Sequence, residues 1–253
     1  MVGPGISLSI QNCNSLNVVS SINNQDLKIS AIMGYKSDII LLSDVRLNGR
    51  DHTVSEKIRL NYTMHFNSRS NSRGVAILFN NDLVHEVLDT YADPQENILL
   101  LRTKVNNFEM IIGSIYGPNL DIGCAVFFDL ICTKINSWGR LPCVIGGDWN
   151  ATYSNLPLNE NLDVLFMRNI PSRVRSDLVR DLCENLDLTD PFRTLHPESR
   201  DFTFVPSGTL RTNRSRIDYF LISSGLYNNL ESCNIAQGYC SKTFDNKPVF
   251  LSL

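Results

Sequence analysis

Two polar side chains follow an apolar run past the middle of the chain, in the segment GGDWNAT at residues 146–152. Asp148 and Asn150 lie two positions apart, and side chains at that spacing on a β-strand point to the same side. A carboxylate and a carboxamide on one side of a rigid strand can face one ligand together. The segment therefore predicts a polar site at the end of a strand.

Other predicted strands also end in polar side chains that carry oxygen. These residues are Asn12 and Asn14 in SIQNCNSL, Asp44 in DIILLSDVRL, Tyr116 in IIGSIYGPN, Asp218 in SRIDYFLIS, and Asp245 and Asn246 in TFDNKPVFLSL. Taken singly, each is more typical of a turn or a helix cap than of a ligand. If the strand ends converge on one edge of a β-sandwich, they form a pocket suited to Mg²⁺ or Mn²⁺ and to a phosphate.

The elements that would position these residues are short strands with few helices between them. Strands are predicted at 7–12, 38–43, 62–67, 74–79, 97–105, 109–116, 142–147, 202–205, 216–222, 232–237 and 248–253. Helices are predicted at 25–35, 124–138 and 172–186, with Ser172 after Pro171 as the N-cap of the last. This order predicts an α/β fold of two packed, mainly antiparallel β-sheets flanked by helices. Without a repeat or a linker, residues 1–253 form one domain.

The composition is that of an ordinary soluble globular protein, with 43% hydrophobic and 19% charged residues. We expect neither a transmembrane helix nor a signal peptide. The seven cysteines form no CxxC pair, which predicts reduced thiols in a cytosolic or nuclear protein. At a net charge of −3, any nucleic-acid surface has to be local.

The polar motifs, taken in their order, carry a family resemblance that covers essentially the whole chain. They are the first-strand Asn12, Asp44 after the second strand, the IYxPN-like turn at 116–119, the GDxN motif at 148–150, the RIDYxL motif at 216–221 and the terminal pair at 245–246. This order resembles the endonuclease/exonuclease/phosphatase family. Within it, the chain is similar to the apurinic-type endonuclease domain of LINE-like, non-LTR retrotransposons.

The resemblance implies a four-layer α/β sandwich that hydrolyses phosphodiesters with Mg²⁺, for which Mn²⁺ can substitute. It assigns Asn12, Asp44 and Asp245 to the metal side of the site. It assigns Asp148 and Asn150 to the attacking water. Because in-line attack places extra charge on the phosphate oxygens, a metal and fixed donors are the expected main source of rate.

The resemblance gives the remaining site residues roles around the phosphate. Tyr116 contacts the scissile phosphate and Asp218 helps to fix the site. Asp245 is expected to orient and polarise the residue at position 246, which is a histidine in the family.

Two positions depart from the family pattern. Asp44 stands where glutamate is more usual, which keeps the carboxylate on a shorter side chain. Asn246 stands in the place of the histidine, and an amide cannot become cationic or shuttle a proton. Such a loss commonly lowers the rate by about 10² to 10⁴. The sequence therefore predicts a weak or inactive nuclease, through either engineered inactivation or natural decay.

We expect structural or solvated roles for all four histidines, His52, His65, His85 and His196, with His52 and His85 in loops or at strand edges.

Basic residues indicate where DNA would bind. A predicted hairpin carries Arg211, Arg214 and Arg216 and leads into Asp218, so its tip could enter a DNA groove. The alternative is a solvated hairpin whose Arg216 pairs with a nearby acid. Asn119 in the tyrosine turn and Arg73 in NSRSNSRG are further candidates for DNA contact. A second patch, Arg168, Arg173, Arg175 and Arg180, is interleaved with acids and is interpreted as a solvated helix face.

Three functions are consistent with the sequence. The first is a DNA endonuclease domain that nicks double-stranded target DNA and leaves a 3′-hydroxyl to prime reverse transcription. Its expected context is a larger polyprotein with a reverse transcriptase, with no membrane and no small-molecule cofactor, in the cytoplasm and then the nucleus. The second is another phosphodiesterase of the same fold, acting on abasic DNA, RNA tails, or phosphorylated inositol or lipid. The third is a nucleic-acid-binding module without catalysis.

Overall fold

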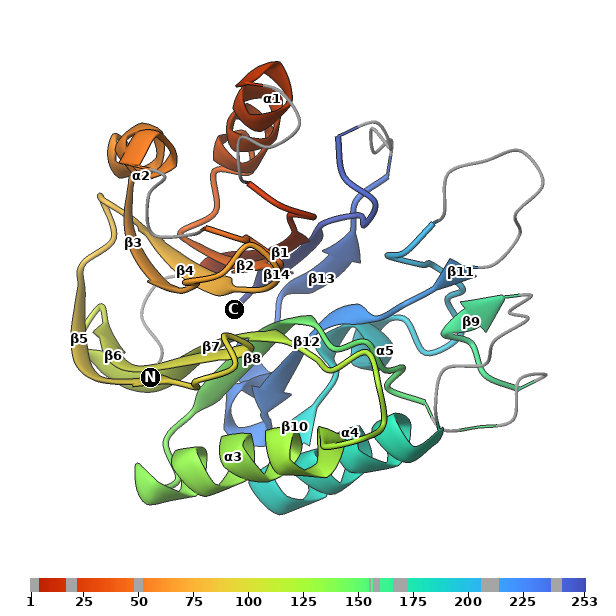
Figure 1. Cartoon of the computed structure of the whole chain (residues 1–253). Coiled ribbons are helices and arrows are strands. Elements are labelled where there is room, and N and C mark those ends of the chain that lie inside the picture. Colours follow the sequence, from red (N-terminus) through yellow and green to blue (C-terminus); the bar gives the residue numbers. More distant parts are fainter. Residues whose placement is uncertain are drawn as a thin grey trace.

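Two β-sheets of six strands each pack face to face in the computed structural model of the chain (Figure 1). The structure describes residues 5–16, 22–47, 52–154, 156, 160–165, 173–205, 214–237 and 243–253. Helices cover the outer face of each sheet, so the molecule has the four layers of the predicted α/β sandwich (Figure 1). None of the helices in the described segments is long and apolar enough to cross a membrane.

The first sheet combines strands from both ends of the sequence. Its order is β13-β14-β1-β2-β4-β3. The strands are β1 (Ser7–Asn12), β2 (Ile39–Ser43), β3 (Tyr62–Asn67), β4 (Val75–Asn80), β13 (Ser232–Ile235) and β14 (Val249–Ser252). Helices α1 (Ile22–Met33) and α2 (His52–Arg59) lie on its outer face (Figure 1).

The second sheet is built from the middle of the chain, in the order β10-β12-β8-β7-β6-β5. Its strands are β5 (His85–Ala92), β6 (Ile98–Val105), β7 (Phe108–Tyr116), β8 (Cys143–Asp148), β10 (Leu188–Thr189) and β12 (Asp218–Ser223). Helices α3 (Cys124–Ser137) and α4 (Arg173–Leu186) cover its outer face (Figure 1). The remaining elements are the short helix α5 (Pro191–Leu195), the 3₁₀ helix η1 (Ser224–Asn229), and a ribbon of β9 (Val164–Leu165) with β11 (Arg214–Ser215).

The core forms because the central strands are apolar on both sides. Along β2, Ile39 and Leu41 face the space between the sheets, while Ile40 and Leu42 pack in the cluster under α1 and α2. A similar cluster under α3 and α4 contains Trp149, which is fully buried. Strands covered on both faces are expected to be continuously apolar rather than alternating.

The structure confirms most predicted strands, with the predicted antiparallel majority; β1–β2 and β7–β8 are the parallel pairs among the described strands. The prediction of a strand at 202–205 is wrong, because Phe204 makes only isolated bridges to Ser215 and Asn246. The sequence analysis missed β5, an edge strand with mostly exposed residues and therefore no apolar face to reveal it.

The helices also differ in part from the prediction. The structure adds α2, which begins at His52, so the assignment of His52 to a loop or strand edge is wrong. It also adds the five-residue helix α5, which Asp190 caps by accepting hydrogen bonds from two backbone N–H groups. The predicted cap at Pro171 and Ser172 lies outside the described residues.

Candidate active site

The polar strand ends meet at one end of the sandwich, around a pocket of about 430 Å³. Its lining includes Asn12, Asn14, Asp44, Tyr116, Asn119, Asp148, Asn150, Arg175, Asp245 and Asn246. The convergence follows from topology. Strands β1 and β2 run parallel in one sheet and β7 and β8 run parallel in the other, so the carboxyl ends of each pair reach the same edge of their sheet.

The two glycines before Asp148 allow the backbone to pack closely at this site. A Cβ added to Gly146 would lie 2.7 Å from Cγ2 of Ile10, in the facing sheet. A Cβ on Gly147 would lie 2.0 Å from the carbonyl oxygen of Ile115, and its φ of +147° is unfavourable for other residues. Gly146 therefore lets the two sheets approach where Asn12 and Asp148 meet, and Gly147 allows close packing of β8 against β7 in the same sheet.

Asp148 is a buried acid of the pocket, at 4% exposure. Its carboxylate accepts hydrogen bonds from Nδ2 of Asn12 at 2.7 Å and from the backbone N–H of Asn150 at 2.8 Å. Burial raises the pKa of Asp148 to about 6, and the nearby Asp44 adds to the rise. An acid with this pKa can exchange a proton near neutral pH.

Asn150 shares the pocket with Asp148, although strand alternation does not place it there. β8 ends at Asp148, and Asn150 has a left-handed φ of 48°, a conformation that asparagine tolerates better than most residues. Its Nδ2 donates to the carbonyl oxygen of Gly117 at 2.9 Å. The amide therefore also links the GDxN turn to the tyrosine turn.

Asn246 is held by Asp218, which corrects the expectation that Asp245 orients position 246. Nδ2 of Asn246 donates to Oδ2 of Asp218 at 2.6 Å. Asp218 lies opposite Asp148 in the β12–β8 register, and burial together with the charge of Asp148 raises its pKa well above the usual range. Asp245 instead accepts a hydrogen bond from Nδ2 of Asn14. The sequence could not identify the partner because Asp245 is adjacent in the chain whereas Asp218 approaches from another sheet.

The predicted metal side consists of oxygen donors that fit a divalent cation such as Mg²⁺. Among the described residues no group of three or more His, Cys, Asp or Glu gathers as a metal cluster, so the set combines the carboxylates of Asp44 and Asp245 with the amide of Asn12. The sequence analysis missed Arg46, whose Nε and Nη2 each donate to one oxygen of Asp44 at 2.8 Å. Within the described part of the chain, each carboxylate oxygen of Asp44 accepts one bond from Arg46, which leaves it a lone pair for a cation.

Tyr116 and Asn119 also line the pocket, and Tyr116 is the register partner of Asp148 on the neighbouring strand. Burial and the nearby acids Asp44 and Asp148 raise the pKa of Tyr116 to about 12, while a hydrogen bond with the Asn119 side chain works in the other direction. The phenol is therefore a neutral hydrogen-bond donor at physiological pH. A neutral donor is suited to a phosphate oxygen.

Arg175 is a second residue that the sequence analysis missed, because it was interpreted as part of a solvated helix face. From the first turn of α4, its Nη1 donates to the carbonyl oxygens of Asn150 at 2.5 Å and Pro118 at 3.0 Å. Its Nε donates to Asp121 at 3.0 Å. The sequence gave no signal that Arg175 contacts two distant turns, because the residue lies at the start of a helix among neighbouring acids.

Lys28 was missed as well and fixes the loop that carries Asn14. Its Nζ donates to the carbonyl oxygens of Cys13 at 2.8 Å, Asn14 at 2.7 Å and Ser15 at 2.9 Å. Asn14 and Ser15 both have left-handed φ values, 41° and 71°. The sequence of α1, INNQDLKISAIM, contains several other polar residues and gave no signal that Lys28 is buried.

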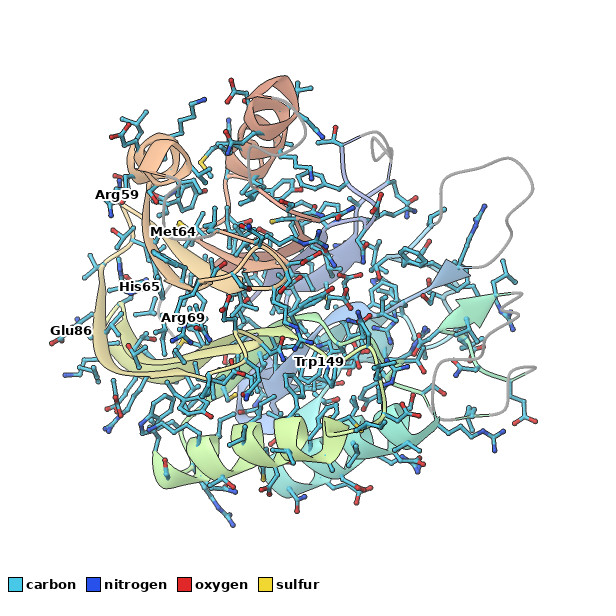
Figure 2. All side chains as sticks on the ribbon, in the orientation of Figure 1. Arg59, Met64, His65, Arg69, Glu86 and Trp149 are labelled. Atoms are coloured by element: carbon cyan, nitrogen blue, oxygen red, sulfur yellow. The ribbon has the colours of Figure 1, made fainter. Side chains whose placement is uncertain are left out.

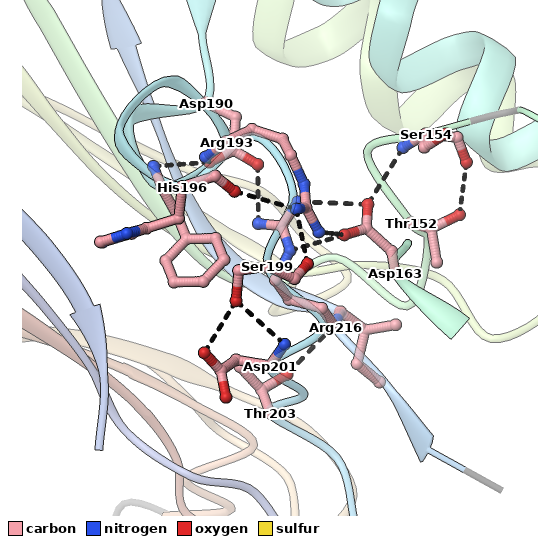
Figure 3. Close-up of polar contacts among 12 residues, drawn as sticks. Thr152, Ser154, Asp163, Asp190, Arg193, His196, Ser199, Asp201, Thr203 and Arg216 are labelled. Carbon is pink, nitrogen blue, oxygen red and sulfur yellow. Dashed lines mark hydrogen bonds and ion pairs between the residues drawn. The ribbon is translucent and has the colours of Figure 1, made fainter. Parts of the chain in front are cut away.

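The structure corrects the assignment of Arg216 to DNA contact. Its side chain is fully buried, with Nε 2.8 Å from Oδ1 of Asp163 and Nη1 2.6 Å from Oδ2 of Asp190. Figure 3 shows Arg193 converging on the same Asp163. This matches the alternative in which Arg216 pairs with a nearby acid.

The other predicted DNA contacts are distributed around the pocket. Arg214 is exposed on β11, and Arg73 is exposed with Nη1 3.4 Å from Oδ1 of Asn97. Asn119 lines the pocket itself. Arg211 lies outside the described residues.

No histidine within the described side chains lines the pocket. His85 stacks on Phe79 with ring centroids 4.3 Å apart, and His196 lies 3.0 Å through Nε2 from the carbonyl oxygen of Cys233. Figure 2 shows His65 at the edge formed by β3 and β5, away from Trp149, which follows Asp148 in the chain. These three side chains are accounted for by packing and local hydrogen bonds.

A two-sheet sandwich with an acidic, amide-rich pocket at the ends of its central strands defines a class of α/β-sandwich hydrolases. The chain belongs to the endonuclease/exonuclease/phosphatase family, whose model matches residues 11–238. That family comprises nucleases and phosphatases.

Known proteins agree with this membership. The chain is 30% identical over 169 residues to the Transposon TX1 uncharacterized 149 kDa protein of Xenopus laevis, covering 65% of this chain but only 12% of that much longer relative. An AP endonuclease from Archaeoglobus fulgidus superposes with a TM-score of 0.75 at 18% identity, covering 97% of this chain and 98% of the other. The 3′ phosphatase NExo from Neisseria, bound to product DNA hairpin, gives 0.74 at 20% identity with the same coverage. At these identities, the two structures establish the fold alone.

Proposed function

We propose that this chain is the endonuclease domain of a LINE-like transposon protein and hydrolyses one phosphodiester of double-stranded target DNA. The proposal rests on one observation above all, the convergence of Asp148, Asn150, Tyr116 and the Asp218–Asn246 pair on one pocket. The product is a nicked strand with a 3′-hydroxyl, which serves as the primer for reverse transcription.

The proposed chemistry divides among the residues that line the pocket. Asp148 accepts a proton from the attacking water, for which its pKa of about 6 is suited. Asn150 orients that water, and the Tyr116 hydroxyl donates to a phosphate oxygen. A Mg²⁺ or Mn²⁺ ion held by Asp44, Asp245 and Asn12 supplies, when bound, charge stabilisation for the phosphate.

Position 246 is the weak point of this site. The Asn246 amide is held in place by Asp218 and can donate a hydrogen bond to the phosphate, but it cannot carry the positive charge of an imidazolium. We therefore propose that the chain as written cleaves DNA slowly or not at all. A histidine at this position would lie against Asp218, whose carboxylate would stabilise its protonated form.

The testing experiment is nicking of supercoiled plasmid in Mg²⁺ by the chain, by Asn246→His and by the double variant Asn246→His, Asp148→Ala. We expect Asn246→His to nick faster than the original by about 10² to 10⁴, and the double variant to be inactive. Omitting the metal should abolish nicking by the active variant. If Asn246→His binds DNA but nicks no faster than the original, the chain is a binding module rather than an endonuclease.

A second candidate activity follows from the fold neighbours, an AP endonuclease and a 3′ phosphatase. The same Asn246→His variant can be offered an abasic duplex, a 3′-phosphorylated nick and an intact plasmid under identical conditions. We expect the intact plasmid to be cleaved. Cleavage restricted to the abasic or 3′-phosphorylated substrate would replace the target-nicking proposal with a repair-type activity.

The transposon relative also suggests the context of the chain. It is far longer than this chain, which is consistent with our proposal that residues 1–253 form one domain of a polyprotein that also carries a reverse transcriptase. A protein that nicks chromosomal DNA has to act in the nucleus after synthesis in the cytoplasm. We propose that route for this protein.

A further inference from the structure

A second hollow of about 690 Å³ lies next to the active-site pocket. Asn119 lines both cavities, so the two adjoin at this residue. One wall of the hollow is apolar and includes Leu120, Ile122 and Val126. The other wall is polar and includes Arg73 and Asn97.

The apolar wall is exposed to an unusual degree. Leu120 is 71% exposed, Ile122 92% and Val126 61%, and all three lie within seven residues of one another on the turn before α3 and its first part. Single exposed apolar side chains need no explanation, whereas a group of them beside a site marks a contact surface.

The turn that carries these side chains is tied firmly to the active site. The backbone N–H of Gly117 donates to the carbonyl oxygen of Asp148 at 2.7 Å, and Arg175 holds Pro118 and Asp121 at 3.0 Å each. Leu120 and Ile122 are therefore presented outward from an anchored turn. Such anchoring fixes their position relative to the scissile phosphate that the pocket would hold.

The polar wall offers the positive charge of Arg73. Within the described residues, Arg73 makes no ion pair with any carboxylate. Asp93, which also lines the hollow, is already engaged by the backbone N–H groups of Asn97 at 2.8 Å and Ile98 at 2.6 Å. Helix α3 begins at this hollow without a side-chain cap, which further favours an anion.

We propose that this hollow receives an unstacked nucleotide of the cleaved DNA strand, next to the scissile phosphate. The base contacts Leu120 and Ile122, and Arg73 contacts the backbone phosphate. A hollow lined by both apolar side chains and a cation matches a nucleotide, which has an apolar base face and an anionic phosphate. The inference rests on the proposed function, because the position of the hollow directly beside the pocket at Asn119 is what selects a DNA strand over a second copy of the chain.

The test is binding to two DNA duplexes that differ only in one unpaired nucleotide, measured by fluorescence anisotropy. A bulged nucleotide is already partly unstacked, so the wild-type chain should bind the bulged duplex more tightly than the paired one by about tenfold. The double variant Leu120→Ser, Ile122→Ser should lose this preference. Leu60 and Val84 are 79% and 69% exposed elsewhere, so Leu60→Ser, Val84→Ser is the matched control and should retain it.

Arg73→Gln provides a second test of the same site. It should weaken binding to both duplexes and lower the slope of log affinity against log salt by about one. The matched control is Arg59→Gln, since Arg59 is the exposed last residue of α2 and Figure 2 shows it remote from Trp149. The control should leave both affinities and the slope unchanged.

The outcomes separate the two proposals. If the wild-type chain binds neither duplex, the DNA endonuclease proposal fails and this inference fails with it. If it binds DNA but Leu120→Ser, Ile122→Ser keeps the preference for the bulge, only the nucleotide site is overturned. If the double variant instead converts a dimer to a monomer in size-exclusion chromatography, the hollow is occupied by a second copy of the chain. Melting temperatures equal to the wild type would exclude misfolding of each variant.

Discussion

Asp148 and Asp218 face each other across two neighbouring strands, with little water to separate their charges. Burial raises the pKa of both carboxyls, and the charge of Asp148 further raises the pKa of Asp218. Such an arrangement destabilises the fold at neutral pH and is retained where chemistry requires it. At the scale of single residues, the two buried acids of the site therefore lower the stability of the folded chain.

This loss predicts a variant that is inactive but more stable. An acid whose pKa is higher in the folded than in the unfolded state binds more protons when folded, so stability falls as the pH rises between the two values. For Asp148 that window runs from about 4 to about 6. Without metal at pH 7.5, we expect Asp148→Asn to raise the melting temperature by roughly 5 °C.

The gain should disappear below about pH 4, where Asp148 is protonated in both states. Thermal melts in a chelator from pH 4 to pH 8 measure this directly. Asp82→Asn, at an exposed turn, is the control and should melt like the wild type at every pH. A variant that is less stable than the wild type at pH 7.5 would contradict the proposed cost of ionising Asp148.

At the scale of elements, a buried ion cluster joins three segments beside the site (Figure 3). Asp163 lies next to β9, Asp190 caps α5, and Arg216 precedes β12. Their contacts fix the start of β12 and thereby the position of Asp218. The charges of the cluster are satisfied only when all three segments are in place.

Removing one member should therefore be costly. Asp163→Ala leaves the fully buried guanidinium of Arg216 with Asp190 as its remaining acid, and we expect a loss of about 3 to 5 kcal/mol in the free energy of unfolding. Asp201 accepts a hydrogen bond from Ser199 in the same region but is only partly buried, so Asp201→Ala should cost about 1 kcal/mol or less. Urea unfolding measures both. Equal losses would show that the cluster has no special role.

At the scale of the whole molecule, the first sheet cannot form from one half of the sequence. β1 from the start of the chain pairs with β14 from its end, and also with β2. The space between the sheets is filled by side chains of both, and Gly146 of β8 packs against Ile10 of β1. The two sheets therefore depend on each other for a core.

This dependence predicts one cooperative unfolding transition for the chain. Tryptophan fluorescence reports on the outer core around the buried Trp149, while far-UV circular dichroism reports on both sheets and all helices. The two signals should give coincident midpoints in urea. Separate midpoints would show that residues 1–253 contain two folding units and would contradict the single-domain proposal.

The sequence by itself determined the local features of this protein. The periods of its apolar residues predicted most strands and the three long helices α1, α3 and α4, because alternation and helical spacing are properties of neighbouring residues. The order of its polar motifs predicted the family and the residues that line the pocket. Asp148 and Asn150 were identified in this way.

Only the tertiary structure decided which of these groups touch. The partner of Asn246 is Asp218 and not its neighbour Asp245, Arg216 is buried between two acids, and Arg175 and Lys28 hold turns distant in sequence. The hollow beside Asn119 depends on segments that carry Arg73, Asn97 and Ile122. The physical reason is that burial and pairing depend on how distant segments pack. The sequence does not indicate whether a charged side chain is solvated by water or paired with a buried acid.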